Sequence, residues 1–272
     1  MSAARPPEGA PSGAVGEFAS QHVLVTGAAS GIGAALVREL LSQGARVSAL
    51  DVDEAGLQAL RADAPQPGDL LALRVDVADG PAVDAAVAQA EAALGAIDCL
   101  ACVAGVLQMG RITELTDAQW QRTFAINAGG VFNTCRAVAA RMVPRRHGAI
   151  VNVSSNAATT PRAAMGAYAA SKAAVTQLSR CLALELAEHG IRCNVVSPGS
   201  TDTEMQRAMW RQGSSREAVI GGDAARFRIG IPLRKIATPE EIVQSILFLL
   251  SDRASHITLH DLRVDGGATL DQ

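Results

Sequence analysis

Short apolar runs alternate with longer segments of helical pattern along most of this chain. The apolar runs are five to seven residues long and hold Val, Leu, Ile and Ala at adjacent positions, so a strand built from them would be buried on both faces. Helix-length segments separate these runs, which is typical of parallel strands that carry helices on each face of a sheet. The predicted strands are 22–26, 46–50, 70–75, 97–103, 148–154, 191–197 and 261–265, and the predicted helices lie at about 32–43, 54–62, 81–94, 117–142, 167–189 and 239–250.

This alternation predicts an α/β fold, namely a single doubly wound, Rossmann-type domain with a seven-stranded parallel sheet and helices on both faces. The predicted domain covers residues 21–272. Within it, residues 198–238 are polar and rich in glycine, and such a long interruption predicts a substrate lid. Residues 1–20 contain 14 Ala, Pro, Gly and Ser, which is too little apolar surface to offset the entropy of ordering. They are predicted to be a disordered leader.

Composition and charge exclude several classes of protein. Of the 272 residues, 49% are hydrophobic, so the chain as a whole is not disordered, and a net charge of −3 provides no electrostatic footprint for nucleic acid or an anionic membrane. The apolar stretches are shorter than the roughly 18 residues that span a bilayer, and the first residues do not have the pattern of a secretory signal. We therefore expect a cytoplasmic protein that binds neither nucleic acid nor membrane and acts on a small molecule.

Five cysteines are consistent with this expectation. An odd number in a chain without an export signal indicates reduced thiols. Cys99 and Cys102 form a C-x-x-C pattern, but they lie in a predicted buried strand, where residues three apart point to opposite faces. No other Cys or His pair has the spacing of a zinc site. We interpret both thiols as packing residues and predict no metal site.

A glycine-rich turn joins the first predicted strand to the first predicted helix. Gly27, Gly31 and Gly33 follow Thr26 in the spacing G-x-x-x-G-x-G. Glycines at such a turn let the backbone approach a pyrophosphate, while the helix N-terminus supplies free N–H groups and the positive end of its dipole. Because this turn lies between a first strand and a first helix, it predicts dinucleotide binding rather than an ordinary tight turn.

Acidic residues at strand ends bear on the choice of cofactor. Asp51 ends the second predicted strand, 24 positions after Gly27, where a carboxylate accepts hydrogen bonds from both ribose hydroxyls of NAD and repels the 2′-phosphate of NADP. The glycine turn contains no Arg or Lys, so we expect NAD. Asp76 ends the third strand and can reach the adenine amino group, although an acid is also common in a strand-end turn. Asp53 and Glu54 are interpreted as helix-start acids.

The candidate catalytic residues lie in the middle of the chain. Tyr168, the single tyrosine, precedes Lys172 by four residues in a predicted helix, so the two side chains share a face and the ammonium is expected to lower the pKa of the phenol. Ser155 ends the fifth predicted strand, 13 residues before Tyr168, where its hydroxyl can bond a reacting oxygen. Asn127 lies in the helix that precedes this strand. A Y-x-x-x-K pattern alone usually marks a surface, but together with the strand-end serine and the glycine turn it predicts an active site.

With these motifs, the sequence resembles the classical short-chain dehydrogenases/reductases over residues 21–270. The resemblance implies a catalytic tetrad of Asn127, Ser155, Tyr168 and Lys172, and a segment 197–203 that meets the nicotinamide. The cofactor-binding residues expected from the motifs and the resemblance are Gly27, Ser30, Gly31, Ile32, Gly33, Asp51, Asp76, Val77, Ala104, Gly105, Tyr168, Lys172, Pro198, Thr201 and Thr203.

One motif departs from the family pattern. The family usually has Asn-Asn-Ala-Gly after its fourth strand, whereas this chain has Cys102-Val103-Ala104-Gly105. The asparagine of that motif normally braces the central sheet, so we expect apolar packing to replace it here.

Longer segments resemble one group within the family, the 2,3-dihydro-2,3-dihydroxybenzoate dehydrogenases. The resemblance implies NAD-dependent oxidation of a ring hydroxyl of a cyclohexadiene carboxylate, in siderophore or related secondary-metabolite biosynthesis, by a homotetramer. In that reaction Tyr168 would take the hydroxyl proton and Ser155 would steady the oxygen. Lys172 would hold the nicotinamide ribose, and Asn127 would keep a water in the proton relay. The segments are 105–110, 160–162, 192–203, 205–207 and 256–261.

The substrate of that group is an anion, so a cation is expected near the pocket. Arg162 follows Ser155 by seven positions and is the first choice; Arg207, in the predicted lid, is the second. A planar guanidinium can bind a carboxylate with two hydrogen bonds, although each of these residues could equally be an exposed surface arginine. The expected substrate contacts are Ser155, Arg162, Met165, Gln108, Met205 and Arg207.

Two alternatives remain open from the sequence. A dehydrogenase for 2,3-dihydro-3-hydroxyanthranilate, or for another cyclic alcohol, would use the same residues, since that amino analogue has the same ring and carboxylate. An NAD-binding regulator without catalysis is the other alternative. The presence of Ser155, Tyr168 and Lys172 argues against it, because a binding module has no need of all three.

Overall fold

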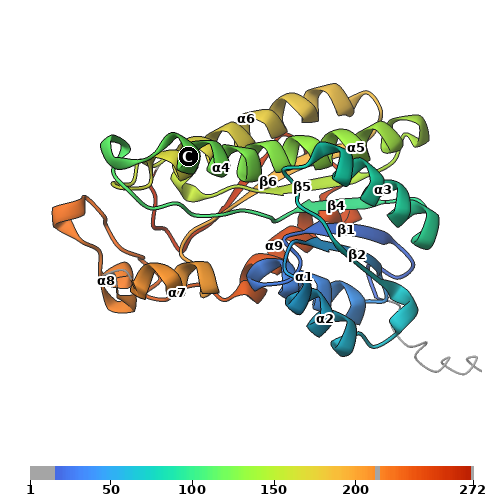
Figure 1. Ribbon diagram of the computed structural model, residues 1–272, viewed down its shortest axis with the longest axis horizontal. Helices are drawn as coiled ribbons and strands as arrows, with labels where there is room; N and C mark the ends of the chain where they lie inside the picture. Colours follow the sequence, from blue (N-terminus) through green and yellow to red (C-terminus); the bar gives the residue numbers. More distant parts are fainter. Residues whose placement is uncertain (1–15, 212–214, 271–272) are drawn as a thin grey trace, which may run out of the picture.

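A parallel sheet of seven strands forms the centre of the molecule (Figure 1). The computed structural model describes residues 16–211 and 215–270. The strand order is β3-β2-β1-β4-β5-β6-β7, every neighbouring pair is parallel, and each predicted strand is found within two residues of its predicted ends. The predicted doubly wound α/β fold is therefore confirmed. The strands are β1 (His22–Thr26), β2 (Arg46–Asp51), β3 (Leu70–Arg74), β4 (Cys99–Cys102), β5 (Ala149–Val153), β6 (Arg192–Pro198) and β7 (Asp261–Val264).

Helices cover both faces of this sheet, and an apolar core lies between each helix layer and the strands. Because both faces of the strands are buried, their sequences are continuously apolar rather than alternating. The helices are α1 (Gly31–Ser42), α2 (Glu54–Asp63) and α9 (Pro239–Leu250) on one face, and α3 (Gly80–Leu94), α5 (Gly130–Arg145) and α6 (Gly166–Ala187) on the other.

The cysteines illustrate how one strand serves both cores. Cys99 packs in the core beneath α1 and α9, whereas Cys102 packs in the opposite core, as predicted for this C-x-x-C pattern. Cys102 lies in the same core as Cys135 and Cys193. Apolar packing thus replaces the asparagine that the family usually has at this point.

Polar residues between the apolar runs determine where several helices begin. The Asp53 carboxylate accepts the N–H of Ala55 at the start of α2. Thr238 and Glu241 cap the start of α9 reciprocally, each side chain accepting a backbone N–H of the other residue. Such caps satisfy N–H groups that the first turn of a helix leaves unpaired, so the helix ends follow directly from the sequence.

The predicted helix at 117–142 is not one regular helix. The helix α4 (Asp117–Phe124) continues through a π-helical turn (Ala125–Gly129) into α5, which ends at Arg145. The π turn holds one residue more than an α-helical turn, and Asn127 within it is fully buried. The sequence pattern does not reveal this turn, because one extra residue leaves the apolar positions on either side helical.

Residues 16–20 form a turn that belongs to the folded domain. The Phe18 side chain is fully buried in the core beneath α1, and the N–H of Ser20 donates to the carbonyl of Gly44 at 3.0 Å. This corrects the predicted domain boundary at residue 21, since one buried aromatic ring and one backbone bond order these residues. The remainder of the predicted leader, residues 1–15, lies outside the described residues.

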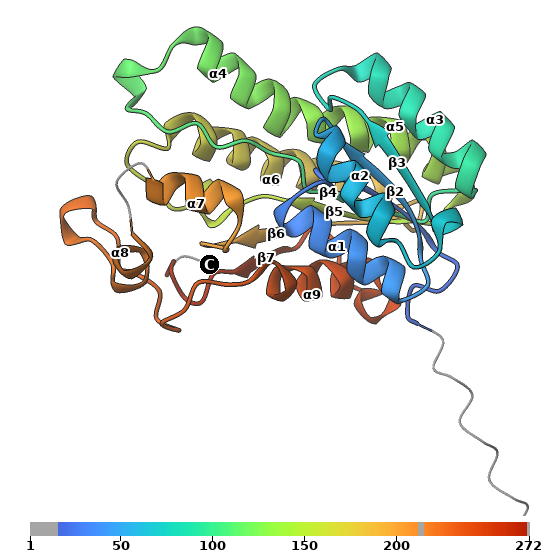
Figure 2. The ribbon, with the colours of Figure 1, turned by 60° about the horizontal axis from the view of Figure 1, so that its bottom comes forward.

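The predicted lid contains two short helices that lie beyond the carboxyl ends of the strands. They are α7 (Glu204–Arg211) and α8 (Arg216–Gly221), and Figure 2 shows both of them apart from the two helix layers. They pack on a small apolar core of their own, formed by Val219, Ile231 and Ile236 with Trp210, Ile220 and Ala268. The lid is therefore a separate packing unit attached to the end of the sheet.

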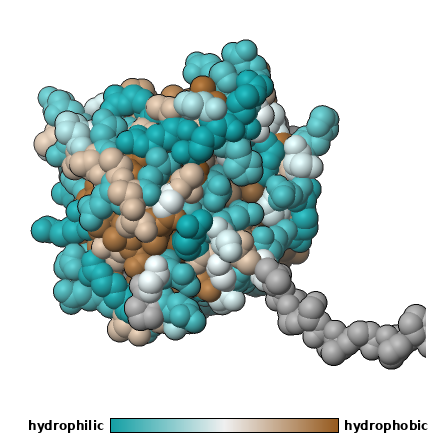
Figure 3. Space-filling model, turned by 90° about the vertical axis from the view of Figure 1, so that its right-hand side faces the viewer, coloured by the Kyte–Doolittle hydropathy of each residue, from teal (hydrophilic) through white to brown (hydrophobic). Residues whose placement is uncertain are grey.

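The outer surface is mostly polar on the side seen in Figure 3. Its apolar side chains gather mainly in the lower left part of that view. Across residues 16–211 and 215–270, no helix is both long enough and apolar enough to cross a membrane.

Candidate active site

A pocket of about 560 Å³ opens at the carboxyl ends of the strands. It lies where the strand order reverses, because β1 is flanked by β2 on one side and by β4 on the other. Open α/β sheets bind their ligands at such a point. The walls of the pocket come from the glycine turn, from the segments that follow β2 to β6, and from α7.

The glycine turn that was predicted to hold a dinucleotide forms one wall of this pocket. Gly27 and Gly31 have φ angles of +67° and +50°, which favour glycine. A Cβ added to Gly33 would lie 1.9 Å from the carbonyl oxygen of Gly27, and one added to Gly27 would lie 2.6 Å from the backbone of Ala104. The start of α1 also lines the pocket, and the N–H groups and dipole of a helix N-terminus suit a diphosphate.

Asp51, at the end of β2, is held rigidly in the pocket wall. Its Oδ2 accepts the N–H of Ala29 at 2.9 Å, and its Oδ1 accepts the N–H of Asp53 at 3.0 Å. The bond from Ala29 ties the end of β2 to the glycine turn, and the bond from Asp53 orients the carboxylate. Asp76 also lines the pocket. Its Oδ1 accepts the N–H of Ala78 at 2.9 Å, so the same residue stabilises the turn after β3 and lies at the cofactor end of the pocket.

This end of the pocket fits an adenine dinucleotide. It combines a backbone turn without Cβ atoms, a helix N-terminus for the phosphates, and two carboxylates for ribose and adenine. Gly33 packs beneath the turn and does not line the pocket. The other predicted cofactor residues line it, namely Gly27, Ser30, Gly31, Ile32, Asp51, Asp76, Val77, Ala104, Gly105, Tyr168, Lys172, Pro198, Thr201 and Thr203.

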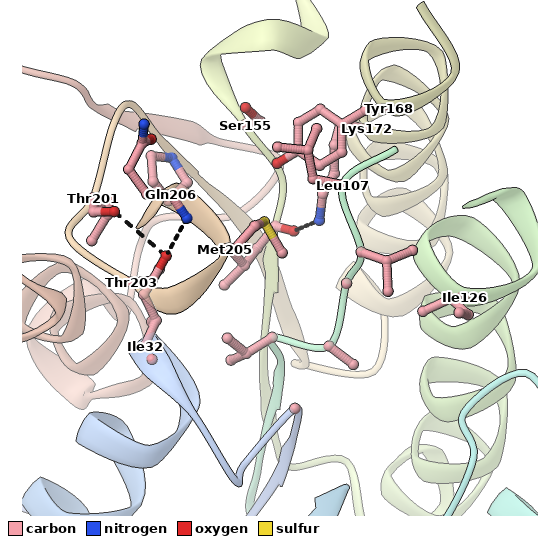
Figure 4. Close-up of a pocket in the computed structure, with 18 of the residues that line it drawn as sticks. Ile32, Leu107, Ile126, Ser155, Tyr168, Lys172, Thr201, Thr203, Met205 and Gln206 are labelled. Carbon is pink, nitrogen blue, oxygen red and sulfur yellow. Dashed lines mark hydrogen bonds between the residues drawn. The ribbon is translucent and has the colours of Figure 1, made fainter. Parts of the chain in front are cut away.

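Ser155, Tyr168 and Lys172 lie together on another wall (Figure 4). Ser155 follows β5, accepts the N–H of Ala157 at 3.1 Å, and is hydrogen-bonded to the Tyr168 phenol. Lys172 follows Tyr168 by one turn of α6, and its Nζ lies 5.9 Å from the centre of the phenol ring. The same Nζ donates to the carbonyl of Val153 at 2.8 Å. Strand β5 and helix α6 thus bring the three side chains together as the spacing predicts.

The protonation of these side chains differs from the expectation. Burial raises the pKa of Tyr168 above its usual value, and the hydrogen bond with Ser155 offsets this only in part. Burial lowers the pKa of Lys172 to about 8, because the ammonium loses its water. The expected lowering of the Tyr168 pKa is therefore not produced by the protein alone, because burial of the phenol is the largest effect.

Asn127 supports this wall without lining the pocket. Its Oδ1 accepts the N–H of Val106 at 2.8 Å, and its Nδ2 donates to the carbonyl of Val106 at 3.0 Å and to Oγ of Ser171 at 2.9 Å. A Cβ added to Gly105 would lie 3.3 Å from Nζ of Lys172 and 3.4 Å from Oδ1 of Asn127. Asn127 therefore ties the loop after β4 to α6 directly beside Lys172, which is the geometry of a positioning residue.

The predicted substrate residues divide into two groups. Gln108 and Arg207 do not line the pocket: the Gln108 amide donates to the carbonyl of Met109 at 2.8 Å, and Arg207 forms an ion pair with Asp202 at 2.8 Å with 54% of its side chain exposed. One amide nitrogen of Gln108 and the guanidinium of Arg207 are thus engaged outside the pocket, and their substrate contacts stay predictions. Those that line the pocket are Ser155, Arg162, Met165 and Met205.

Arg228 lines the pocket and was missed by the sequence reasoning. It lies in a hairpin in which Asp223 and Arg228 exchange two backbone hydrogen bonds, each of 2.9 Å. Gly222 and Gly230 flank the hairpin with φ angles of +90° and +82°. These glycines indicate a tight turn in the lid, but nothing in the sequence indicates that the Arg228 side chain faces the pocket.

Gln206 also lines the pocket and was missed. It lies on α7, a short helix that the apolar pattern did not predict. Because the helix was not predicted, the direction of the Gln206 side chain could not be predicted either. Arg122 of α4 lies in the pocket wall as well, with an exposed side chain.

The fold and the pocket together define a class of protein. A doubly wound parallel sheet, a glycine turn at a helix N-terminus and a Tyr–Lys pair beside a strand-end serine describe an oxidoreductase that uses a nicotinamide dinucleotide. A comparison with protein-family models finds a match to the short chain dehydrogenases over residues 21–213. The chain belongs to the short-chain dehydrogenase family, whose members act on a CH–OH group with NAD or NADP.

Named relatives cover nearly the whole chain. It is 49% identical to the 2,3-dihydro-2,3-dihydroxybenzoate dehydrogenase of Bacillus subtilis (strain 168), over 90% of this chain and 95% of that protein. It is 47% identical to the vibriobactin-specific 2,3-dihydro-2,3-dihydroxybenzoate dehydrogenase of Vibrio cholerae serotype O1, over 93% of this chain and 97% of that protein. A solved structure of a short chain dehydrogenase/reductase family protein matches with a TM-score of 0.81 at 34% identity, covering 92% of this chain and 98% of that one.

Replacing Lys172 should change how stability depends on pH. The pKa of Lys172 falls from its ordinary 10.5 to about 8 in the folded protein, so below pH 8 the fold carries a buried ammonium at a cost of roughly 3 kcal/mol. The cost disappears as the pH rises from 8 to 10.5, because over that interval the unfolded chain keeps the proton and the folded one has lost it. Methionine has no such cost at any pH. Relative to Lys172→Met, we expect the wild type to gain about 2–3 kcal/mol of unfolding free energy across this interval, measured with denaturant.

Lys235→Met is the matched control. Lys235 is largely exposed and paired with Glu241, so its replacement should not produce this pH-dependent difference. If Lys172→Met and the wild type kept a constant difference in stability from pH 7 to 10.5, the buried ammonium would be ruled out.

Proposed function

We propose that this enzyme oxidises a ring hydroxyl of 2,3-dihydro-2,3-dihydroxybenzoate with NAD, giving 2,3-dihydroxybenzoate and NADH in siderophore biosynthesis. One observation carries the proposal: a single pocket combines the Ser155, Tyr168 and Lys172 group with the guanidinium side chains of Arg162 and Arg228. The first group suits an alcohol, and the two guanidinium groups suit a carboxylate on the same small molecule. Relatives of this name, at 47% and 49% identity over at least 90% of the chain, support it.

In this proposal Tyr168 is the base. As the phenolate, it accepts the proton of the reacting hydroxyl, while the Ser155 hydroxyl bonds the same oxygen and holds it in place. Bound NAD supplies the hydride acceptor and a positively charged ring. Because burial alone raises the pKa of Tyr168, the phenolate depends on nearby positive charge. Lys172 contributes to that charge and holds the nicotinamide ribose.

The proton then needs a way out of a buried site. Asn127 fixes the loop after β4 next to Lys172, and we infer that it keeps a water between the Lys172 ammonium and solvent. Removal of a hydride and a proton from the diol leaves a cyclohexadienone, which tautomerises to the aromatic catechol. Aromatisation makes the overall reaction strongly favourable, and the residues of this chain supply binding, orientation and proton transfer.

The preference for NAD over NADP is inferred from Asp51. Its two backbone hydrogen bonds fix a negative charge at the end of β2, beside the glycine turn. That charge suits the two ribose hydroxyls of NAD and repels a 2′-phosphate.

We further infer a cytoplasmic homotetramer. Trp120, Phe132 and Leu184 expose 43%, 47% and 66% of their surface on α4, α5 and α6, which lie together on one side of the sheet (Figure 1). Large apolar side chains exposed on adjacent helices suit packing against the same helices of another copy about a twofold axis. A second twofold axis would complete a closed tetramer.

The proposed reaction is tested by NADH formation from a panel of dihydroaromatic acids and neutral cyclic alcohols. We expect the dihydroxy acid to be the best substrate. Tyr168→Phe should lower kcat by about 10²–10⁴-fold, because it removes the base, while NAD affinity stays unchanged. Failure of the wild type to oxidise the dihydroxy acid, with good turnover of a neutral alcohol, would refute the proposal.

The cofactor preference is tested at Asp51. The wild type should prefer NAD to NADP by more than tenfold in kcat/KM, and Asp51→Asn should reduce this preference by about tenfold or more, roughly 1.4 kcal/mol. Asp53→Asn removes a neighbouring charge that only caps α2, and it should leave the preference unaltered. Comparable use of both cofactors by the wild type would show that Asp51 does not determine the choice.

The carboxylate contacts are tested at the two pocket arginines. Arg162→Met and Arg228→Met each keep an apolar side chain and remove the charge. If each binds the carboxylate, kcat/KM for the acid should fall by an equivalent of about 2–4 kcal/mol, with little change for a neutral cyclic diol. Arg207→Met should change neither value, because that residue is paired with Asp202 outside the pocket. Equal losses on both substrates would indicate a structural role for the arginine concerned.

A further inference from the structure

We propose that Gln206 binds the second ring hydroxyl of the substrate through its amide nitrogen, and that this contact makes the enzyme selective for the diol over its amino analogue. The inference rests on the proposed function and assigns a specificity role within the same pocket. It decides between two substrates that the sequence left open.

The amide nitrogen of Gln206 is buried without a hydrogen-bond partner among the described residues. The residue is 9% exposed and lines the pocket, yet its Nε2 finds no acceptor among the residues that the structure describes. A buried donor left unpaired is costly, and such groups persist in native proteins mainly where a ligand or water completes them. Among the described residues that line the pocket, Gln206 alone has such a buried side-chain nitrogen.

The backbone beneath this side chain is fixed relative to the cofactor end. The N–H of Gln206 donates to Oγ1 of Thr203 at 3.3 Å, where α7 begins. Thr203 in turn packs on the glycine turn, since a Cβ added to Gly31 would lie 3.1 Å from its methyl carbon. Figure 4 shows Gln206 beside Thr203 and Thr201, on the lid side of the pocket from Ser155, Tyr168 and Lys172. A substrate ring bound between these two walls would direct one edge toward Ser155 and Tyr168 and another edge toward Gln206.

The polar groups of the substrate can be matched to these walls. The reacting hydroxyl belongs beside Ser155 and Tyr168, and the carboxylate belongs beside the guanidinium groups of Arg162 and Arg228. One polar group of the ring is then left, the second hydroxyl, and among the described pocket residues Gln206 has a buried donor left unsatisfied. The ring hydroxyl can accept the amide N–H. An aliphatic amine in its place is protonated at neutral pH, has only donors, and cannot accept.

The contact predicts a measurable selectivity. A site with a buried donor rejects an analogue that lacks the matching acceptor more strongly than an apolar site does. We therefore expect the wild type to use the dihydroxy acid at least 100-fold better, in kcat/KM, than 2,3-dihydro-3-hydroxyanthranilate. Gln206→Leu has nearly the same volume and no polar atom. It should lower kcat/KM for the diol by about 10–100-fold, leave the amine unchanged or improved, and keep NAD affinity and the melting temperature at or above wild-type values.

Gln206→Glu provides a second variant that needs no change in side-chain length. Its carboxylate accepts hydrogen bonds from an ammonium and repels the anionic acid, so it should shift the ratio further toward the amine than Gln206→Leu does. Gln58→Leu, on an exposed position of α2 outside the pocket residues, controls for loss of a glutamine amide and should leave the ratio unaltered.

Each outcome separates the two proposals. A wild type that oxidises the diol and the amine equally well, or Gln206 variants that lose activity on both substrates in the same proportion, would overturn the role of Gln206 while leaving the proposed function in place. A wild type that oxidises neither acid would overturn the proposed function, and this assignment with it. A ratio that collapses in Gln206→Leu and falls further in Gln206→Glu supports the assignment.

Discussion

The architecture of this enzyme depends on one close contact of backbone with backbone. Gly27, Gly33 and Ala104 meet where β1 passes into α1 beside the end of β4, and neither glycine has room for a Cβ atom. This contact seats α1 on the sheet at the point where the strand order reverses, and it brings the segments after β2 and β4 to the same edge. The carboxylate of Asp51 is bonded to the same turn, so the cofactor end is assembled from main chain and one side chain. The remaining walls of the pocket are then placed by elements that already pack on this edge.

Some of the side chains that line the pocket lower the stability of the folded protein. The Lys172 ammonium is buried and keeps its proton less firmly than a lysine in water, and the Gln206 amide nitrogen is buried without a partner among the described residues. Neither group would be favoured in a core selected only for stability. Asn127 is also buried, but all of its amide groups are hydrogen-bonded, so it holds the loop after β4 rigid. The costly groups thus face the pocket, whereas the satisfied one lies behind it.

Most of the sheet and the cofactor end could be predicted, because their physical causes are local in the sequence. Strands buried on both faces need continuous apolar runs, and a turn that approaches a backbone needs glycine, so β1 and Gly27 are visible without a structure. The Tyr168 and Lys172 pair could be predicted as well, since a spacing of four residues on a helix is also local. Its protonation could not, because burial and the bond from Lys172 to the Val153 carbonyl arise only when α6 packs on β5.

The lid was the least predictable part for the same reason. Its helices are short and polar, and their positions are determined by a small core that joins residues from distant parts of the lid. Arg207 was selected from its place in the sequence, yet it pairs with Asp202, while Gln206 beside it and Arg228 in the hairpin reach the pocket. Which of several polar residues faces a ligand depends on the rotation of a helix or hairpin. The order of residues alone does not specify that rotation.

The π-helical turn between α4 and α5 has an evolutionary consequence. It contains one residue beyond a regular α-helix, so deletion of a single codon within Ala125–Gly129 could restore an unbroken helix. The deletion would leave α5 in nearly its present rotation relative to α4, because the π turn accommodates its extra residue within one wide turn. Val131, Cys135 and Val138 would therefore keep their places on the core face of α5. Reading-frame-preserving deletions that elsewhere shorten a loop harmlessly would here remove or displace Asn127, whose amide is hydrogen-bonded to the loop after β4. Length variation in descendants of this sequence should therefore accumulate in the lid and the surface turns, while the segment between α4 and α5 keeps its length.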